Sequence, residues 1–408
     1  MSTAESRRPA NDNKRWRVIS VLVFSSVLNY LDRQLLPAAA PLLRREFALA
    51  NRDYGALLSA FSLSYAAFAV PAGLWLDRIG LRRGIRAAVA LWSLAGAATG
   101  AMKSLEGLLA CRGLLGIAQA AGVPAVGKAI ALYLRPGERA LGHALSQTGL
   151  TLGAVLAPPL AVWVSLRWGW RAAFFFAGAL GLLWLPVWNR AAGWAPGRML
   201  AGDPRIPLRL LVREPGLWAI VGAALLSMTV YTLWSNWTTL YLVEAQGLSF
   251  EQTAGWAALP PLASNLGGLS GGLSSLLWTR RGLAPVRARM RVCLLCALLL
   301  LATALIPLAS SPVLAVAGIS LSFFLCSAWS VNLYSLPLDL YGAERAAFAT
   351  SLLTGAYGFL QAAVSPVYGW LADRYGFAPL CIAVSVLPLA GWSLLRVARL
   401  EREIETAD

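Results

Sequence analysis

The fold of this chain is decided by the stretch Gly73-Leu-Trp-Leu-Asp77-Arg78-Ile-Gly80-Leu-Arg82-Arg83. This stretch lies at the join between two long apolar runs, residues 53–77 and 84–102. A helix that crosses a bilayer needs about 20 mostly apolar residues, and both runs approach or exceed that length. The stretch therefore predicts a short basic loop that connects two membrane-spanning helices.

The composition of the whole chain agrees with a membrane protein. Of its 408 residues, 58% are apolar and 13% are charged, and the mean hydropathy is +0.62. Soluble domains carry about 25% charged residues, so an ordinary soluble enzyme and a disordered chain are both excluded. The net charge of +16 would suggest nucleic-acid binding in a soluble protein, so the position of each charge has to be weighed against membrane topology.

Charged and Pro/Gly-rich segments divide the chain into twelve apolar runs. The longest polar connection, residues 190–214, separates six runs from six. We therefore predict an all-α polytopic membrane protein with two six-helix bundles, at 17–189 and 215–397, between an N-terminal tail at 1–16 and a C-terminal tail at 398–408. The predicted spans are 17–41, 53–77, 84–102, 106–134, 139–165, 170–189, 215–243, 251–279, 288–309, 312–341, 345–373 and 377–397.

The Lys and Arg residues predict the orientation of these spans. Of the 35, 25 lie in the tails and loops on the side of the termini, seven lie on the other side, and three lie inside predicted spans. Cytoplasmic loops carry the excess of positive charge, so both termini are predicted in the cytoplasm of a bacterial inner membrane. The positive charge then sets the orientation of the chain in the lipid bilayer. We therefore predict that the protein binds no nucleic acid.

The two halves also resemble each other at a fixed spacing. Pro159 precedes Gly169 by ten residues, and Pro366 precedes Gly376 by ten residues, at an offset of 207. The segment 26–30 corresponds to 233–237 at the same offset. Two parallel six-helix repeats are the plan of a secondary transporter, with the substrate site at their interface near mid-membrane. The sequence thus favours alternating access over a channel.

Other function classes have little support. Cys293 and Cys296 have the spacing of a zinc or redox pair, but no second pair or His is near, so we expect buried structural thiols. With one histidine and no nucleotide motif, the chain is predicted to be no enzyme and to hold no metal or cofactor, with the proton gradient as the driving force. A receptor that transports nothing stays open as an alternative, although its soluble tails would be short.

The opening stretch resembles the G-x-x-x-D-R-x-G-R-R signature of the major facilitator superfamily, which lies in the loop between helices two and three of that family. A weaker second copy covers residues 271–282 and has Leu276 at the position of the acid. The resemblance implies the major facilitator fold, with two pseudo-symmetric six-helix bundles. It also implies that residues of the stretch act as a gate between conformations: Gly73, Asp77, Arg78, Gly80, Arg82 and Arg83.

Further segments resemble the anion:cation symporters, in particular the hexuronate and galactonate-type sugar-acid transporters. They are Asn29-Tyr-Leu-Asp-Arg33, Arg112-Gly-Leu-Leu-Gly116, Pro124-Ala-x-x-Lys128, Gly169-Trp-Arg-Ala-Ala-Phe174 and Asn332-Leu-Tyr-x-Leu-Pro337. The implied function is secondary active transport of a small organic anion, by a protein that works as a monomer. Spinster-like lysolipid or drug transporters carry a pentapeptide similar to the first segment, and they are the alternative within the superfamily.

Charges inside the predicted spans are the strongest candidates for the transport site. An ion at mid-bilayer costs about 2.5–3.5 kcal/mol on insertion scales, so Asp32 and Arg33 should face a wet cavity or a partner. The resemblance implies that Arg33 binds the substrate carboxylate, that Asp32 carries a proton, and that Tyr30 lines the sugar site. Adjacent helical positions point about 100° apart, so Asp32 and Arg33 should serve different partners.

Arg112 and Gln119 lie seven residues apart, two turns along one predicted helix face. In proton-coupled sugar-acid transporters the second position is usually Glu. Glutamine can form hydrogen bonds but cannot titrate, so either Asp32 alone carries the proton or coupling is altered. Further candidates for substrate binding, each weighed against simple helix packing, are Gln147, Tyr231, Trp234, Asn236 and Asn332.

Overall fold

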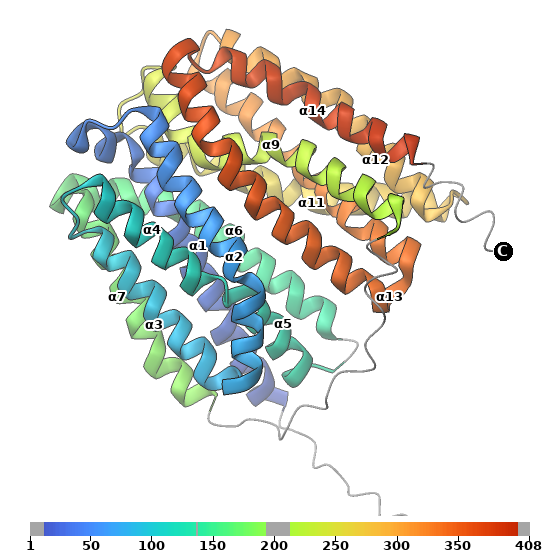
Figure 1. The fold of residues 1–408 in the computed structure, drawn as a ribbon, viewed down its shortest axis with the longest axis horizontal. Coiled ribbons are helices and arrows are strands. Elements are labelled where there is room, and N and C mark those ends of the chain that lie inside the picture. Colours follow the sequence, from blue (N-terminus) through green and yellow to red (C-terminus); the bar gives the residue numbers. More distant parts are fainter. Residues whose placement is uncertain (1–11, 136–137, 193–212, 399–408) are drawn as a thin grey trace, which may run out of the picture.

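The computed structural model describes residues 12–135, 138–192 and 213–398, and every regular element within these ranges is a helix. Figure 1 shows two packed bundles, one from each half of the chain. The elements are α1 (Asp12–Phe47), α2 (Asn51–Ile79), α3 (Leu81–Thr99), α4 (Leu105–Gln119), α5 (Gly122–Tyr133), α6 (Arg139–Trp168), α7 (Trp170–Ala191), α9 (Pro215–Glu244), α10 (Thr253–Trp256), α11 (Leu259–Arg280), α12 (Pro285–Leu300), the 3-10 helix η2 (Leu301–Leu308), α13 (Pro312–Tyr375) and α14 (Ala378–Val397).

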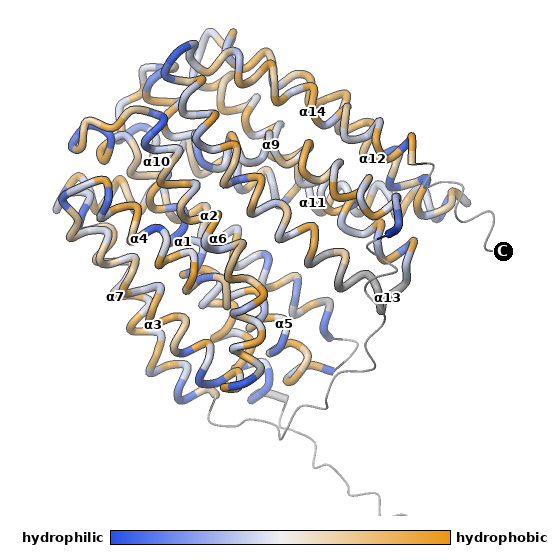
Figure 2. Tube along the Cα trace, in the orientation of Figure 1, coloured by the Kyte–Doolittle hydropathy of each residue, from blue (hydrophilic) through white to orange (hydrophobic). Residues whose placement is uncertain are grey.

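This architecture confirms the predicted all-α membrane protein. Within the described ranges, eight helical stretches are long and apolar enough to cross a membrane. The other four predicted spans are covered by α1, α3, α11 and the second part of α13. Hydrophobic residues run along the helices, and hydrophilic segments gather near their ends (Figure 2). The predicted linker at 190–214 and both predicted tails fall largely outside the described residues.

The helices differ from the predicted spans in several places, since the eighth span is divided between α10 and α11 and the ninth between α12 and η2. The fourth span is interrupted, because α4 ends at Gln119 and α5 begins at Gly122. The tenth and eleventh spans both belong to α13. The Tyr241 hydroxyl donates to the carbonyl of Ile306 (3.0 Å), and its ring lies 5.3 Å from that of Phe377. Both ends of α13 therefore lie beside one residue, and the chain reverses direction between them.

Local sequence explains where several helices begin. The Ser104 hydroxyl accepts the amide of Gly107 at the start of α4, and the Ser311 hydroxyl accepts the amide of Leu314 at the start of α13. Proline stands in the first turn of α9, α11, α12, α13 and α14, where a helix needs no amide donor.

The two halves are joined by contacts at the end of the bundles where α1 ends and α2 begins, opposite the helix termini Asp12 and Val397. We call this end the closed end. Arg44 forms an ion pair with Glu244. The Tyr54 hydroxyl donates to the carbonyl of Asn236 (2.6 Å), and the Ser59 hydroxyl donates to the carbonyl of Ala362 (2.7 Å). These contacts tie α1 and α2 to α9 and α13.

Candidate functional site

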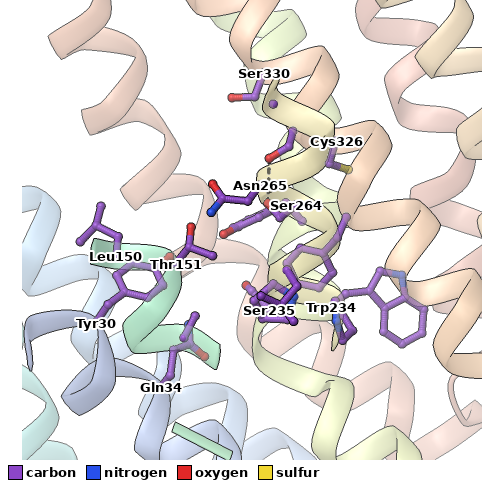
Figure 3. A pocket seen from close by; sticks show the side chains of 18 of the residues that line it. Tyr30, Gln34, Leu150, Thr151, Trp234, Ser235, Ser264, Asn265, Cys326 and Ser330 are labelled. Atoms are coloured by element: carbon purple, nitrogen blue, oxygen red, sulfur yellow. Dashed lines mark hydrogen bonds between the residues drawn. The ribbon is translucent and has the colours of Figure 1, made fainter. Parts of the chain in front are cut away.

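A cavity of about 980 Å³ lies between the two halves. Helices α1 and α6 of the first half and α9, α11 and α13 of the second half supply its walls (Figure 3). The structure places five predicted substrate-binding residues in these walls, and among the described residues that line the cavity none is charged. The five residues are Tyr30, Gln147, Tyr231, Trp234 and Asn236.

Sequence reasoning missed a set of small polar residues in the same walls. On the second half, the Ser264 and Ser327 hydroxyls are 2.7 Å apart, and Asn265 and Ser330 lie beside them (Figure 3). Gln34, Thr148 and Thr151 face them from the first half. Helical spacing could have identified these residues. Gln34 follows Tyr30 by four residues and Ser330 follows Ser327 by three, so each pair lies on one face of its helix.

Tyrosines from both halves meet beside this cavity. The phenol of Tyr30 on α1 lies near those of Tyr231 on α9 and Tyr357 on α13. The Thr232 hydroxyl also donates to the Tyr357 hydroxyl, at 3.4 Å. Aromatic rings with a polar edge can pack on the C–H face of a sugar and bond its hydroxyls.

Two arginines lie behind this wall around one aromatic ring. The guanidinium carbon of Arg33 is 4.4 Å from the ring centroid of Phe61, and that of Arg112 is 4.7 Å from the same centroid. Arg33 also lies over Tyr65 and Tyr30, at 4.6 and 5.6 Å. The ion pairs in the described part of the chain include neither arginine. Aromatic faces attract these cations but do not neutralise them.

Asp32 lies apart from both arginines. Its side chain packs against Gly96 of α3, it is 4% exposed, and within the described residues its Oδ2 has no hydrogen-bond partner. It does not line the cavity. The buried Asp32 carboxylate is therefore separate from the half-buried Arg33 on another face of α1 and from the buried Arg112 on α4.

Gln119 and Asn332 are buried in helix contacts away from the cavity. The Gln119 amide donates to the carbonyl of Asn29 (3.0 Å) and so joins the end of α4 to α1. Asn332 donates to the carbonyls of Gly271 (3.0 Å) and Ala328 (2.9 Å), which joins α13 to α11. Of the predicted binding residues, Arg112, Gln119 and Asn332 are thus in the protein interior, and Arg33 adjoins the cavity through Tyr30.

The predicted gate lies at the turn between α2 and α3. Arg78, Arg82 and Arg83 are exposed there, and the indole of Trp188 donates to the carbonyl of Arg82 (3.1 Å). The side chain of Asp77 lies outside the described part of the structure. The gating role of these residues, including Gly73 and Gly80, stays a prediction.

Two acids outside the membrane-spanning segments have perturbed titration. Hydrogen bonds from the Trp170 indole and then from Arg171 hold the pKa of Glu46 below its ordinary value. Hydrogen bonds from the Arg135 amide (2.9 Å) and the Arg15 guanidinium (2.8 Å) do the same for Glu138. Both carboxylates therefore remain ionised below the pH at which a free Glu titrates.

Comparison with known proteins gives three findings. The family model described as Major Facilitator Superfamily matches residues 22–355. The hexuronate transporter of Escherichia coli strain K12 is 28% identical over 407 residues, 94% of each chain, and the D-galactonate transporter of E. coli O6:H1 is 26% identical over 412 residues, 93% of this chain and 94% of the relative. A crystal structure of a bacterial homolog of the human lysosomal transporter Spinster, inward-facing and unoccupied, has a TM-score of 0.74 at 19% identity and covers 97% of each chain.

Proposed function

The chain belongs to the major facilitator superfamily, and on this premise we propose that it carries a small anionic sugar acid, a hexuronate or an aldonate, across the bacterial inner membrane. It is a multi-pass membrane transporter and not an enzyme. The substrate crosses by alternating access, in which the halves rock about a site at their interface.

The observation that carries this proposal is the pair of arginines around Phe61. Two guanidiniums share one ring within the membrane, and no described ion pair neutralises either one. Burying two such charges is unfavourable unless an anion compensates them for part of the cycle. Arg33, which adjoins the cavity wall at Tyr30, binds the carboxylate of the substrate, since a guanidinium matches a carboxylate with two parallel hydrogen bonds.

The rest of the cavity suits the remainder of a sugar acid. Its walls combine the tyrosines and Trp234 with the hydroxyls and amides of Gln34, Asn265 and Ser330. A sugar acid has one charge, several hydroxyls and a C–H face. The uncharged polar and aromatic wall suits the hydroxyls and the C–H face, and Arg33 beside that wall suits the carboxylate. A lysolipid would need a wide apolar wall, which the polar residues of α6 and α11 interrupt.

Asp32 is the proposed proton carrier. It is the only acid in the described part of the chain that is fully buried between helices of the first half, and one of its oxygens has no partner. Gln119 occupies the position of the usual second acid and cannot titrate. One proton site therefore serves the cycle, and the substrate anchor and the proton carrier lie on different faces of α1.

The excess of Lys and Arg in the terminal tails and their neighbouring loops supports cytoplasmic termini. The closed end then faces the periplasm, and the conformation described above is inward-facing. Substrate would be released from the cavity to the cytoplasm in this state.

Uptake into proteoliposomes tests the proposal. A panel of uronates, aldonates and neutral sugars is offered with and without an inward proton gradient. We expect uptake of at least one sugar acid, stimulated by the gradient, and no uptake of neutral sugars. Arg33→Ala should lower the affinity at least about 30-fold, because it removes one partner of a buried charge pair, and Arg33→Lys should recover only part of it. Uptake that does not depend on the proton gradient would contradict proton coupling but would not contradict transport of the sugar acid.

A further inference from the structure

The first turn of α2 is capped by a residue from the other half of the molecule. The Asp373 carboxylate, near the end of α13, accepts the backbone amide of Asn51 (2.8 Å) through Oδ1 and that of Arg52 (2.9 Å) through Oδ2. These amides belong to the start of a helix and have no partner within it. A carboxylate there is also favoured by the helix dipole.

Helix α2 does not supply this cap itself. The residue before its first turn is Ala50, whose methyl group cannot accept a hydrogen bond. The nearby Asp53 carboxylate accepts only the Ala50 amide, at 3.0 Å. The cap on Asn51 and Arg52 therefore exists only while the two halves are together at the closed end.

Glycines let the two helices approach closely enough for this contact. A Cβ atom on Gly369 would lie 2.2 Å from the Asn51 carbonyl oxygen, and one on Gly55 would lie 2.4 Å from the Ser365 carbonyl oxygen. Any larger residue at either position would have to push α2 and α13 apart. Asp373 lies one helical turn beyond Gly369, so this crossing sets its distance from the start of α2.

The sequence around Asp373 repeats the signature at the other end of α2. Gly369-Trp-Leu-Ala-Asp373-Arg-Tyr-Gly376 shares the Gly, Asp, Arg and Gly positions with Gly73-Leu-Trp-Leu-Asp77-Arg-Ile-Gly80, whereas Phe377 and Ala378 follow where the signature continues with two arginines. Both stretches end a helix in the same way. Gly80 and Gly376 have φ of +84° and +74°, and each amide bonds a carbonyl four residues back at 3.0 Å. The two copies lie at opposite ends of the paired helices α2 and α13.

We propose that Asp373 is the latch of the closed end, and that its hydrogen bonds to the start of α2 set the proportion of molecules in which this end is closed. When the halves separate there, the Asn51 and Arg52 amides lose their acceptor and α2 loses its N-terminal cap. The contact is present in one conformation and absent from the other, so it shifts the equilibrium by its own free energy. The latch does not depend on which substrate the cavity binds.

Distance measurement by electron spin resonance tests the latch. Spin labels are placed at Lys103→Cys and Ser310→Cys, two exposed positions on opposite halves at the closed end, in the full chain in liposomes without substrate. The five native cysteines are buried. Asp373→Ala should lower the ratio of short to long distances about three- to tenfold, the range expected for loss of a helix cap. Asp373→Asn should lower it less, because one oxygen acceptor remains.

Two further variants separate a latch from a simple loss of stability. Glu251→Gln removes an exposed carboxylate from the same end and the same half, and it should leave the ratio unchanged. Ala50→Ser gives α2 a cap of its own, and in the Asp373→Ala background it should not restore the closed fraction. An unchanged ratio in Asp373→Ala, or full recovery by Ala50→Ser, would overturn the proposal.

Gly369→Ala should also favour the open state, and an unchanged ratio there would equally contradict the close crossing on which the latch depends.

Discussion

Arg33 lies over the ring of Phe61, with its guanidinium carbon 4.4 Å from the ring centroid. Arg112 lies 4.7 Å from the same centroid, so one aromatic ring holds two like charges that still repel each other. This arrangement fixes both guanidiniums before any substrate arrives, and it makes Phe61 a positioning residue for the anion site.

Replacement of Phe61 by Leu should therefore weaken substrate binding. Leucine fills most of the same space but has no π face, so the orientation of both arginines is lost. A cation–π contact is worth about 0.5–2 kcal/mol, which predicts an increase in Kd of about tenfold for the two contacts together. Equilibrium binding to the purified protein measures this. Phe175→Leu, at a half-exposed position on the outer face of α7, is the control; equal or tighter binding by Phe61→Leu contradicts the role.

Gln119→Glu should change the pH dependence of uptake without creating proton coupling. The variant adds an acid to the face that carries Arg112, while Asp32 already provides a proton site. The pH of half-maximal uptake should move by about one unit or more, because a carboxylate near a guanidinium titrates differently from an isolated one. If the natural protein ignores a proton gradient and the variant follows one, Asp32 is not the proton carrier.

Asn332→Ala should destabilise the protein and leave substrate affinity within about twofold. The Asn332 side chain is fully buried, and it bonds the Gly271 carbonyl across the close contact of α13 with α11. Interhelical hydrogen bonds in membranes are worth about 0.6–2 kcal/mol. Thermal unfolding in detergent should show a lower Tm, and a Kd raised tenfold with an unchanged Tm would return Asn332 to the substrate site.

Glu138→Gln should lower the Tm at neutral pH, and the difference should fade in acid. The pKa of Glu138 is lowered in the folded state by the Arg135 amide and the Arg15 guanidinium. A lowered pKa stabilises the folded protein above the ordinary pKa of Glu, and the effect is lost as the pH falls through the lowered value. Melting curves from pH 7 downward compare the two proteins. A difference that grows as the pH falls would contradict this assignment.

The sequence predicted the fold well because membrane helices are set by length and hydropathy. Charges and prolines mark the ends of most spans, and these are local features. The break after Gln119 was missed because it lies within the long apolar run 106–134, although Gly122 and Pro124 inside that run do signal it. The reversal within α13 was predicted correctly as two spans.

The site was predicted less completely. Large or charged residues such as Arg33 and Tyr30 stand out in an apolar chain, whereas Ser264 and Ser330 are common in membrane helices and give no signal alone. Asn332 was predicted with helix packing as the alternative, and its hydrogen bonds to neighbouring backbone depend on packing that a sequence does not show. The second signature at 369–376 was visible in the sequence, but its meaning needs the distance from Asp373 to Asn51.

The central claim is that the Arg33 guanidinium beside the cavity binds the carboxylate of a sugar acid. A comparison of D-glucuronate with D-glucuronamide tests this claim most directly. The two ligands differ in charge and share their hydroxyls and ring. Titration of the purified protein should give a Kd for the anion at least about tenfold lower than for the amide, and Arg33→Ala should remove that difference. Equal affinities for the two ligands in the natural protein would contradict the account.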